Sequence, residues 1–128
     1  MGPIQDMITV MQSMPDIERY RFGRMVIDGT PVTRDLIILP GGEIIHNWRR
    51  DRGHFLSAAD IDPLINEPVD IIVVGKGAFG LMNIDPGLPG SLPAGITIIG
   101  RKTSKAIDEY REAVSKDLLV GACFHLTC

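Results

Sequence analysis

The residues with the clearest chemical potential lie in one stretch, residues 75–80, which reads GKGAFG. Its three glycines have the G-x-G-x-x-G spacing of dinucleotide-binding loops, in which glycine lets the backbone approach a pyrophosphate. Lys76 adds a cation beside the backbone N–H donors, and this combination favours an anion. The stretch therefore predicts a site for a small anion or phosphate. Its members are Gly75, Lys76, Gly77, Ala78, Phe79 and Gly80.

Two other interpretations of this loop remain open. A full dinucleotide site needs a helix directly after the loop and an acidic residue about 20 residues further on. Pro86 and Gly87 disfavour a helix directly after the loop. Gly100, Arg101 and Lys102 stand where the acidic residue is expected. The other interpretation is structural: the glycines form a tight junction between a strand and the next segment, with close packing around it.

A basic stretch, RRDRGH at residues 49–54, adds Arg49 and Arg50 to the candidate anion-binding residues. Arginine binds carboxylates and phosphates through forked hydrogen bonds. The alternative is a solvated turn whose charge is balanced by Asp51 and Glu43. Without interleaved aromatic residues, a patch of this size does not predict binding to nucleic acid.

Cys123, His125 and Cys128 suggest either a metal site or a catalytic Cys–His pair, but their spacing matches no standard zinc pattern. A buried free thiol also behaves as a small hydrophobic group. We therefore predict two reduced cysteines, no metal and no cofactor. The sequence shows no convergent set of acid, base and nucleophile, so no catalytic residue is assigned and binding is favoured over catalysis.

The elements that must position these residues follow from hydrophobic patterning. Residues 69–74 form a short apolar run that predicts a strand buried on both faces. Before it, the pattern predicts strands over residues 17–27, 32–39 and 43–48, a hairpin turn at residues 28–29, and a helix over 58–65 with Ser57 as its N-cap. After it come a Pro/Gly-rich segment (84–95) with at most a turn or two of helix near 88–92, a strand (96–99), a helix (104–116) capped by Thr103, and a strand (118–124). This order predicts a three-layer α/β domain with a central mixed sheet, an N-terminal antiparallel hairpin or meander, and parallel βαβ units in the C-terminal half.

Length and charge limit the remaining possibilities. A chain of 128 residues is long enough for one domain, which we place at residues 17–128 after an N-terminal tail or short helix over residues 1–16. The net charge of −3 gives no general attraction to nucleic acid or anionic lipid. No apolar run approaches the ~20 residues of a membrane-spanning helix. The N-terminal residues fit no targeting signal, so we expect a cytoplasmic protein.

Several stretches resemble, in order, a family of small proteins from archaea, bacteria and eukaryotes. The family includes the mammalian adipogenesis-associated domain protein and the mitochondrial complex I assembly factor three. Its signature P-G-G…W-R resembles Pro40, Gly41, Gly42, Trp48 and Arg49, and its ending V-G-x-x-F-H-x-T-C resembles residues 120–128. Residues 20–29 resemble the family's opening hairpin, and residues 71–77 resemble its strand with a G-x-G loop. Thr103, Ala106 and Tyr110 resemble its last helix.

The resemblance implies a three-layer α/β fold and a function that is mostly unassigned in the family. Some members support assembly of the respiratory NADH dehydrogenase, which implies a protein partner and a non-enzymatic binding or assembly role. The alternative is a small-molecule domain, or an enzyme, that uses residues 75–80. The chain differs from the family's usual pattern at residues 84–95, where a longer helix is replaced by a Pro/Gly-rich segment.

Overall fold

The computed structural model describes residues 14–128, so the predicted tail or helix over residues 1–16 lies almost wholly outside the described residues. The central elements are β4 (Leu36–Ile38), β5 (Ile44–His46), β7 (Ile71–Lys76), β9 (Thr97–Arg101), α4 (Thr103–Ser115) and β10 (Val120–His125). An N-terminal ribbon contains β1 (Ile17–Arg21), β2 (Arg24–Ile27) and β3 (Thr30–Val32). The remaining elements are β6 (Phe55–Leu56), the 3-10 helix η1 (Ala58–Ile61), α2 (Asp62–Ile65), β8 (Asn83–Ile84) and α3 (Leu88–Ser91).

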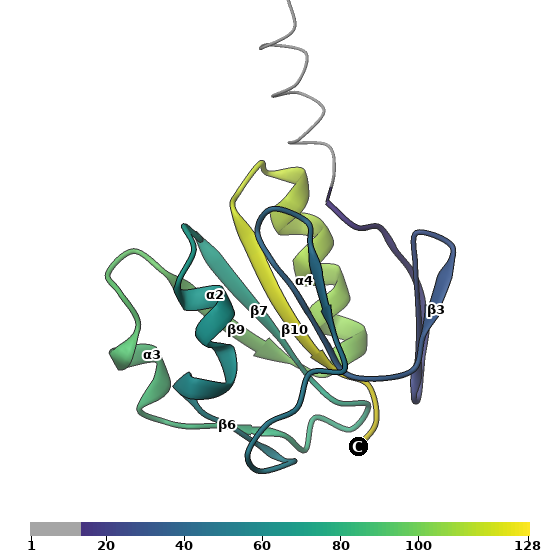
Figure 1. Ribbon diagram of the computed structural model, residues 1–128, viewed down its shortest axis with the longest axis horizontal. Helices are drawn as coiled ribbons and strands as arrows, with labels where there is room; N and C mark the ends of the chain where they lie inside the picture. Colours follow the sequence, from purple (N-terminus) through teal and green to yellow (C-terminus); the bar gives the residue numbers. More distant parts are fainter. Residues whose placement is uncertain (1–13) are drawn as a thin grey trace, which may run out of the picture.

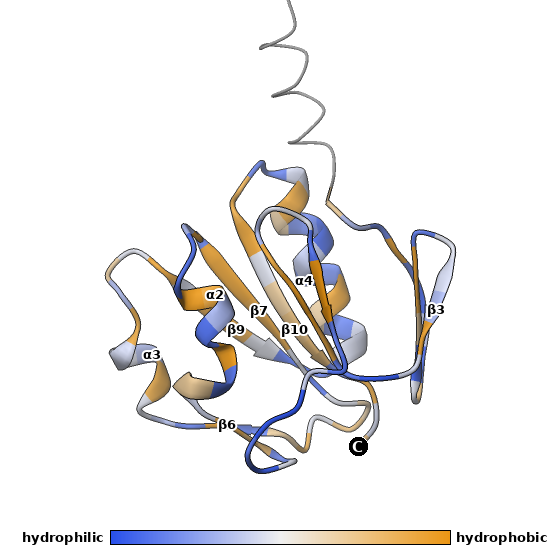
Figure 2. Cartoon of the chain, in the orientation of Figure 1, coloured by the Kyte–Doolittle hydropathy of each residue, from blue (hydrophilic) through white to orange (hydrophobic). Residues whose placement is uncertain are grey.

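A five-stranded mixed sheet in the order β5-β4-β10-β7-β9 forms the middle layer (Figure 1). β7 runs parallel to both β10 and β9, whereas β4 runs antiparallel to β10 and to β5. β7 and β10 are apolar along almost their whole length because they are covered on both faces (Figure 2). The predicted mixed sheet with parallel C-terminal strands is confirmed.

Two hydrophobic cores lie on opposite faces of this sheet. On one face, α4 and the N-terminal ribbon pack together over Val73, Ala122 and Phe124. The apolar side of α4 supplies the predicted stripe, in which Ala106, Ile107, Tyr110 and Ala113 are buried. On the other face, η1, α2 and α3 cover Ile37, Ile72, Val74 and Cys123. The predicted three-layer architecture is therefore confirmed.

The N-terminal third differs from the prediction in its strand boundaries. The expected strand over residues 17–27 is two strands, because the chain turns at Phe22 and Gly23, where glycine takes a φ of 76°. The expected strand over residues 32–39 is also two, interrupted by the polar residues 33–35. As a result β3 pairs with β2 in a separate three-stranded sheet, and β4 joins the central one. The predicted turn at Asp28 and Gly29 is confirmed, with φ values of 48° and 79°.

The short helices follow the sequence signals closely. Ser57 precedes η1, and the Asp60 carboxylate accepts the Ser57 backbone N–H at 2.9 Å. A separate single turn, α2, then begins at Asp62 with Pro63 in its first turn, so the predicted helix over residues 58–65 is split. The Pro/Gly-rich segment holds only the four-residue α3, as expected. Within residues 14–128, no helix is both long and apolar enough to cross a membrane.

Candidate functional site

The candidate residues meet at the edge of the sheet where the parallel strands β7 and β10 end. Lys76 is the last residue of β7 and pairs in register with His125, the last residue of β10. The glycine loop follows Lys76 directly, and α4 begins beside it at Thr103. Ligands of open α/β sheets bind at such edges. The structure thus brings the loop and the C-terminal motif together, although they are far apart in the sequence.

The glycine loop packs against the C-terminal residues without room for a side chain. A Cβ atom at Gly77 would lie 2.6 Å from the Thr127 carbonyl oxygen and 2.8 Å from the His125 ring, and Gly77 also has a φ of +95°. At Gly75 a Cβ atom would lie 2.7 Å from the Phe124 ring. These contacts are the close packing that the structural interpretation of the three glycines requires.

Three backbone amides of the loop already have protein partners. The Gly77 N–H donates to the Thr103 hydroxyl at 2.9 Å, and the Ala78 N–H donates to the Thr127 carbonyl at 2.8 Å. The Gly80 N–H closes a turn onto the Gly77 carbonyl at 3.2 Å. In this conformation, these donors hold the chain together and do not face a ligand. An anion at the loop would depend mainly on side chains, of which Lys76 is half-buried.

Thr103 corrects one prediction. It was expected to cap α4, but Lys102 occupies the cap position and Thr103 is the first helical residue. The reason is that its buried hydroxyl is used elsewhere: it donates to the His125 carbonyl at 2.6 Å while it accepts the Gly77 N–H. One side chain therefore joins α4, the glycine loop and the end of β10.

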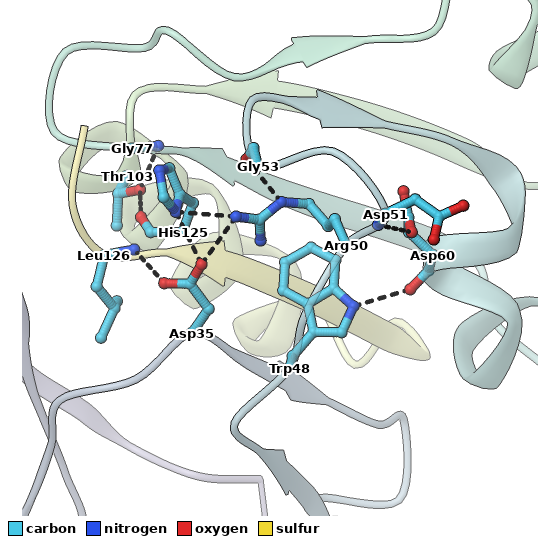
Figure 3. Close-up of polar contacts among 10 residues, drawn as sticks. All are labelled: Asp35, Trp48, Arg50, Asp51, Gly53, Asp60, Gly77, Thr103, His125 and Leu126. Carbon is cyan, nitrogen blue, oxygen red and sulfur yellow. Dashed lines mark hydrogen bonds and ion pairs between the residues drawn. The ribbon is translucent and has the colours of Figure 1, made fainter.

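A polar cluster of Asp35, Arg50 and His125 lies beside this junction (Figure 3). One Asp35 oxygen, Oδ2, lies 2.8 Å from His125 Nδ1 and 3.0 Å from Arg50 Nη2. The other, Oδ1, accepts the Leu126 backbone N–H at 2.9 Å. Because an ionised carboxylate can only accept, we assign the imidazole proton to Nδ1. Sequence reasoning missed Asp35, whose only signal is its position in the polar break before a fully buried strand.

The two candidate arginines have different environments. The Arg50 side chain is only 5% exposed, its Nε donates to the Gly53 carbonyl at 3.0 Å, and its guanidinium lies 4.7 Å from the centre of the Trp48 ring. Arg49 is exposed and has no polar partner among residues 14–128. Trp48 is itself fixed by its indole N–H, which donates to the Asp60 carbonyl at 2.8 Å (Figure 3). The structure therefore brings Arg50, but not Arg49, into the cluster.

Two buried polar atoms of this cluster have no hydrogen-bond partner. They are Arg50 Nη1 and His125 Nε2, and no other buried side-chain nitrogen or oxygen in the described part of the chain is left unpaired. Buried polar groups are normally bonded, so an unpaired atom needs a physical explanation. The exposed His54 ring packs edge-on against His125, with ring centres 5.7 Å apart. The cluster therefore has unused hydrogen-bonding capacity directly beneath a surface loop.

The hydrogen bonds of the cluster also fix the charge of Asp35. Burial acts to raise the pKa of this carboxyl group, but bonds from His125, the Leu126 amide and Arg50 outweigh it, so the pKa lies below its usual value. The ionised form is therefore the one that the folded protein stabilises.

The cysteines do not take part in this site. Cys123 is fully buried on the opposite side of β10 from Phe124, and burial raises the pKa of its thiol to about 12. Such a thiol stays protonated at neutral pH, which argues against a nucleophilic Cys–His pair. Both cysteines are free. Among residues 14–128, no three His, Cys, Asp or Glu side chains lie close enough together to hold a metal ion.

The contacts of Gly77 lead to a first prediction. Gly77→Ala should lower the free energy of unfolding by about 2–5 kcal/mol, because the left-handed backbone and the contact with Thr127 both oppose a side chain. Gly95→Ala is the matched control: its φ is +92°, but nothing lies within 4 Å of its Cβ position, so only the backbone cost of about 1–2 kcal/mol applies. Urea denaturation of both variants measures the difference. Equal losses would show that the loop does not depend on close packing with the C-terminal residues.

The lowered pKa of Asp35 leads to a second prediction. The ionised Asp35 carboxylate stabilises the folded protein fully above its unfolded-state pKa of about 3.9. This stabilisation is lost as the pH falls through the lower pKa of the folded state. Asp35→Asn should therefore be strongly destabilised at pH 7. The difference in melting temperature between the variant and the wild type should become smaller as the pH falls from 5 to 2. Thermal unfolding across this range measures both proteins. A difference that stays constant down to pH 2 would contradict the ionised role of Asp35.

Solved structures with the same fold come from several organisms. The chain is similar to a conserved hypothetical protein from Pyrococcus horikoshii OT3, with 27% identity, a TM-score of 0.76, and coverage of 88% of this chain and 99% of that one. It is also similar to a Bartonella henselae protein described as an outer membrane protein, with 18% identity, a TM-score of 0.74, and coverage of 91% and 98%. A Bordetella parapertussis protein has 15% identity, a TM-score of 0.67, and coverage of 88% and 95%. At these last two identities, the likeness concerns the fold alone.

The sequence itself matches a family model over nearly the whole described domain. The match spans residues 17–125, and the family is described as a protein of unknown function, DUF498/DUF598. The matched region includes the glycine loop, Asp35, Arg50 and His125. This chain belongs to the DUF498/DUF598 family.

Proposed function

We propose that this chain is a non-enzymatic binding domain that docks a protein partner at the edge of the sheet described above. The carrying observation is a surface formed by Phe22, Phe79 and Leu81, which are 55%, 62% and 53% exposed. The two phenylalanine rings contact each other, with centres 6.1 Å apart. Exposed apolar side chains that gather in this way mark interaction sites, and aromatic residues are enriched in protein interfaces.

The backbone holds this aromatic pair in place. Phe22 lies in the turn between β1 and β2, where the Gly23 N–H donates to the Leu126 carbonyl at 2.8 Å. Phe79 lies in the glycine loop, which the Ala78 N–H ties to Thr127. The backbone beside each ring is therefore hydrogen-bonded to the C-terminal segment, at Leu126 for Phe22 and at Thr127 for Phe79. A partner would meet a preorganised surface and would lose little free energy in ordering it.

The rim of this surface suggests what the partner carries. Lys102 is exposed, and its side chain lies 3.1 Å from the position that a Cβ atom at Gly80 would take. An apolar centre with a basic rim favours a partner segment with aromatic or aliphatic side chains flanked by acidic residues.

The family resemblance suggests a biological setting for this binding. Some members of the resembled family support assembly of the respiratory NADH dehydrogenase, so a subunit or assembly partner of that enzyme is the proposed protein ligand. The cytoplasm remains the proposed location. The protonated Cys123 thiol further supports a binding role over a catalytic one.

The aromatic surface leads to a third prediction. The double variant Phe22→Ser/Phe79→Ser should reduce recovery of a native co-purifying protein from the source cell by about tenfold or more, because central aromatic residues dominate interface energetics. The matched control is Leu118→Ser/Leu119→Ser, which changes the other exposed apolar pair, 40% and 46% exposed, before β10. Quantitative mass spectrometry of tagged proteins measures recovery.

The identity of the recovered protein tests the setting as well. A subunit of NADH dehydrogenase that is retained by the control and lost by the double variant would support the assembly role. Equal recovery with all three proteins, or no specific protein with wild type, would count against docking at this surface.

A second candidate function is favoured by the unpaired atoms of the polar cluster. Arg50 Nη1 can donate to an oxyanion, and His125 Nε2 can bond a hydroxyl group or water. We propose as the alternative that a small carboxylate or phosphate enters beneath His54 and contacts Arg50, with Lys76 and residues 75–80 beside it. Arg49 is the exposed residue that would attract such an anion to the site.

This alternative leads to a fourth prediction. Acetate or inorganic phosphate should raise the melting temperature of the wild-type protein, and Arg50→Lys should abolish the rise because it keeps the charge but loses the fork. Arg49→Ala should only weaken it. A flat thermal-shift response to carboxylates, phosphates and nucleotides would exclude the small-anion function at this cluster.

A further inference from the structure

A separate basic hollow lies on the N-terminal ribbon. Its volume is about 630 Å³, and it is lined by Arg19, Tyr20, Arg21, Arg24 and Val26. Volumes of this size are typical of small-molecule sites. None of these residues belongs to the polar cluster or to the aromatic surface described above. The hollow therefore has to be explained on its own.

The pairing of β1 and β2 places three arginines on one face of the ribbon. Arg21 lies directly opposite Arg24, and Arg19 lies directly opposite Val26. The other face of the same ribbon carries Ile17, Met25 and Ile27, which are buried in the core against α4. Side chains alternate between the two faces of a strand, and the pairing shifts register between Ile17 and Arg19. The arginines therefore share the face that is turned away from the core.

This arrangement has an unfavourable electrostatic consequence. Like charges directly opposite each other destabilise an antiparallel pair. No carboxylate forms an ion pair with these arginines within residues 14–128. The carboxylates at the far end of the ribbon have other roles: Glu18 accepts the Gly29 N–H at 2.7 Å, and Asp28 accepts the Asp16 N–H at 3.0 Å. A chain with a net charge of −3 thus concentrates three cations around one hollow.

We infer that this hollow binds a compact polyanion, namely a small molecule that carries several phosphate groups. Directly opposed residues of an antiparallel pair lie about 5 Å apart, and alternate residues of one strand about 7 Å apart. Three guanidinium groups within such distances match the close charge spacing of linked phosphates. Each can form forked hydrogen bonds to phosphate oxygens, and binding would relieve their mutual repulsion.

Calorimetric titration of the full 128-residue chain with inorganic tripolyphosphate tests this site. Wild type should bind tripolyphosphate more tightly than orthophosphate, and raising NaCl should weaken both, because exposed charges are screened. Arg21→Ala and Arg24→Ala should each weaken tripolyphosphate binding at least tenfold. Arg21→Lys should weaken it less, because it retains the charge but loses the fork.

The controls separate this site from a general charge effect and from the other proposals. Lys105→Ala removes one exposed cation from α4, outside the hollow, and should leave the affinity unchanged. Leu118→Ser/Leu119→Ser, which lies outside the hollow and outside both other proposed sites, should also leave it unchanged. Circular dichroism confirms folding of each variant, and Arg19→Ala replaces any variant that does not fold.

Two results would overturn the inference. One is tripolyphosphate binding that survives both Arg21→Ala and Arg24→Ala, since the anion would then bind elsewhere. The other is binding of a hexaglutamate peptide without any response to tripolyphosphate, since the hollow would then hold an acidic protein segment and not a phosphate compound.

Discussion

The Asp35 carboxylate is the interaction on which the candidate site depends. Through its two oxygens it joins three distant parts of the chain: the start of β4, the loop that carries Arg50, and the end of β10. Burying such a charge is unfavourable unless it is paired and hydrogen-bonded, and here both conditions are met. The orientation of the His125 ring and the course of the C-terminal residues both follow from this one side chain.

The C-terminal residues in turn organise the surface around them. They accept or donate backbone hydrogen bonds on both sides, with the ribbon turn at Gly23 on one and the glycine loop at Ala78 on the other. The hydroxyl of Tyr20 adds a further bond to the Leu126 carbonyl at 2.8 Å. The aromatic surface, the polar cluster and the glycine loop are therefore all hydrogen-bonded to the same C-terminal residues, Leu126 and Thr127.

Much of the fold could be predicted from the sequence, because the signals were strong and local. The apolar run of β7, the turn at Asp28 and Gly29, and the stripe of α4 each specify an element with little competition. The boundaries within residues 17–39 could not be predicted, because Phe22 and Gly23 look like part of a continuous strand until the pairing of β1 with β2 is known. The role of Thr103 was predicted wrongly, because a threonine at the start of a helix can either cap that helix or hydrogen-bond to a neighbouring segment. Here its hydroxyl donates to the His125 carbonyl, and only the position of β10 makes this bond possible.

The site was only partly accessible to sequence reasoning for the same reason. Arg50 and the glycines are recognisable by type and spacing, but Asp35 and His125 acquire their relationship only through the sheet order. Arg49 and Arg50 are adjacent and identical in sequence, yet one is exposed and the other is held against Trp48. Nothing in the local sequence distinguishes them, because the distinction comes from the loop's path across the sheet edge.

The position of β10 has a consequence for how the sheet assembles. It follows every other element in the chain, yet it lies between β4 and β7 in the sheet, and those two strands do not pair with each other. The β4–β5 and β7–β9 pairs can each form without it, but they become one sheet only when β10 pairs with both β4 and β7. Until then the two strand edges that β10 covers stay open, and an open apolar edge is vulnerable to aggregation, so insertion of β10 is the step that completes the sheet.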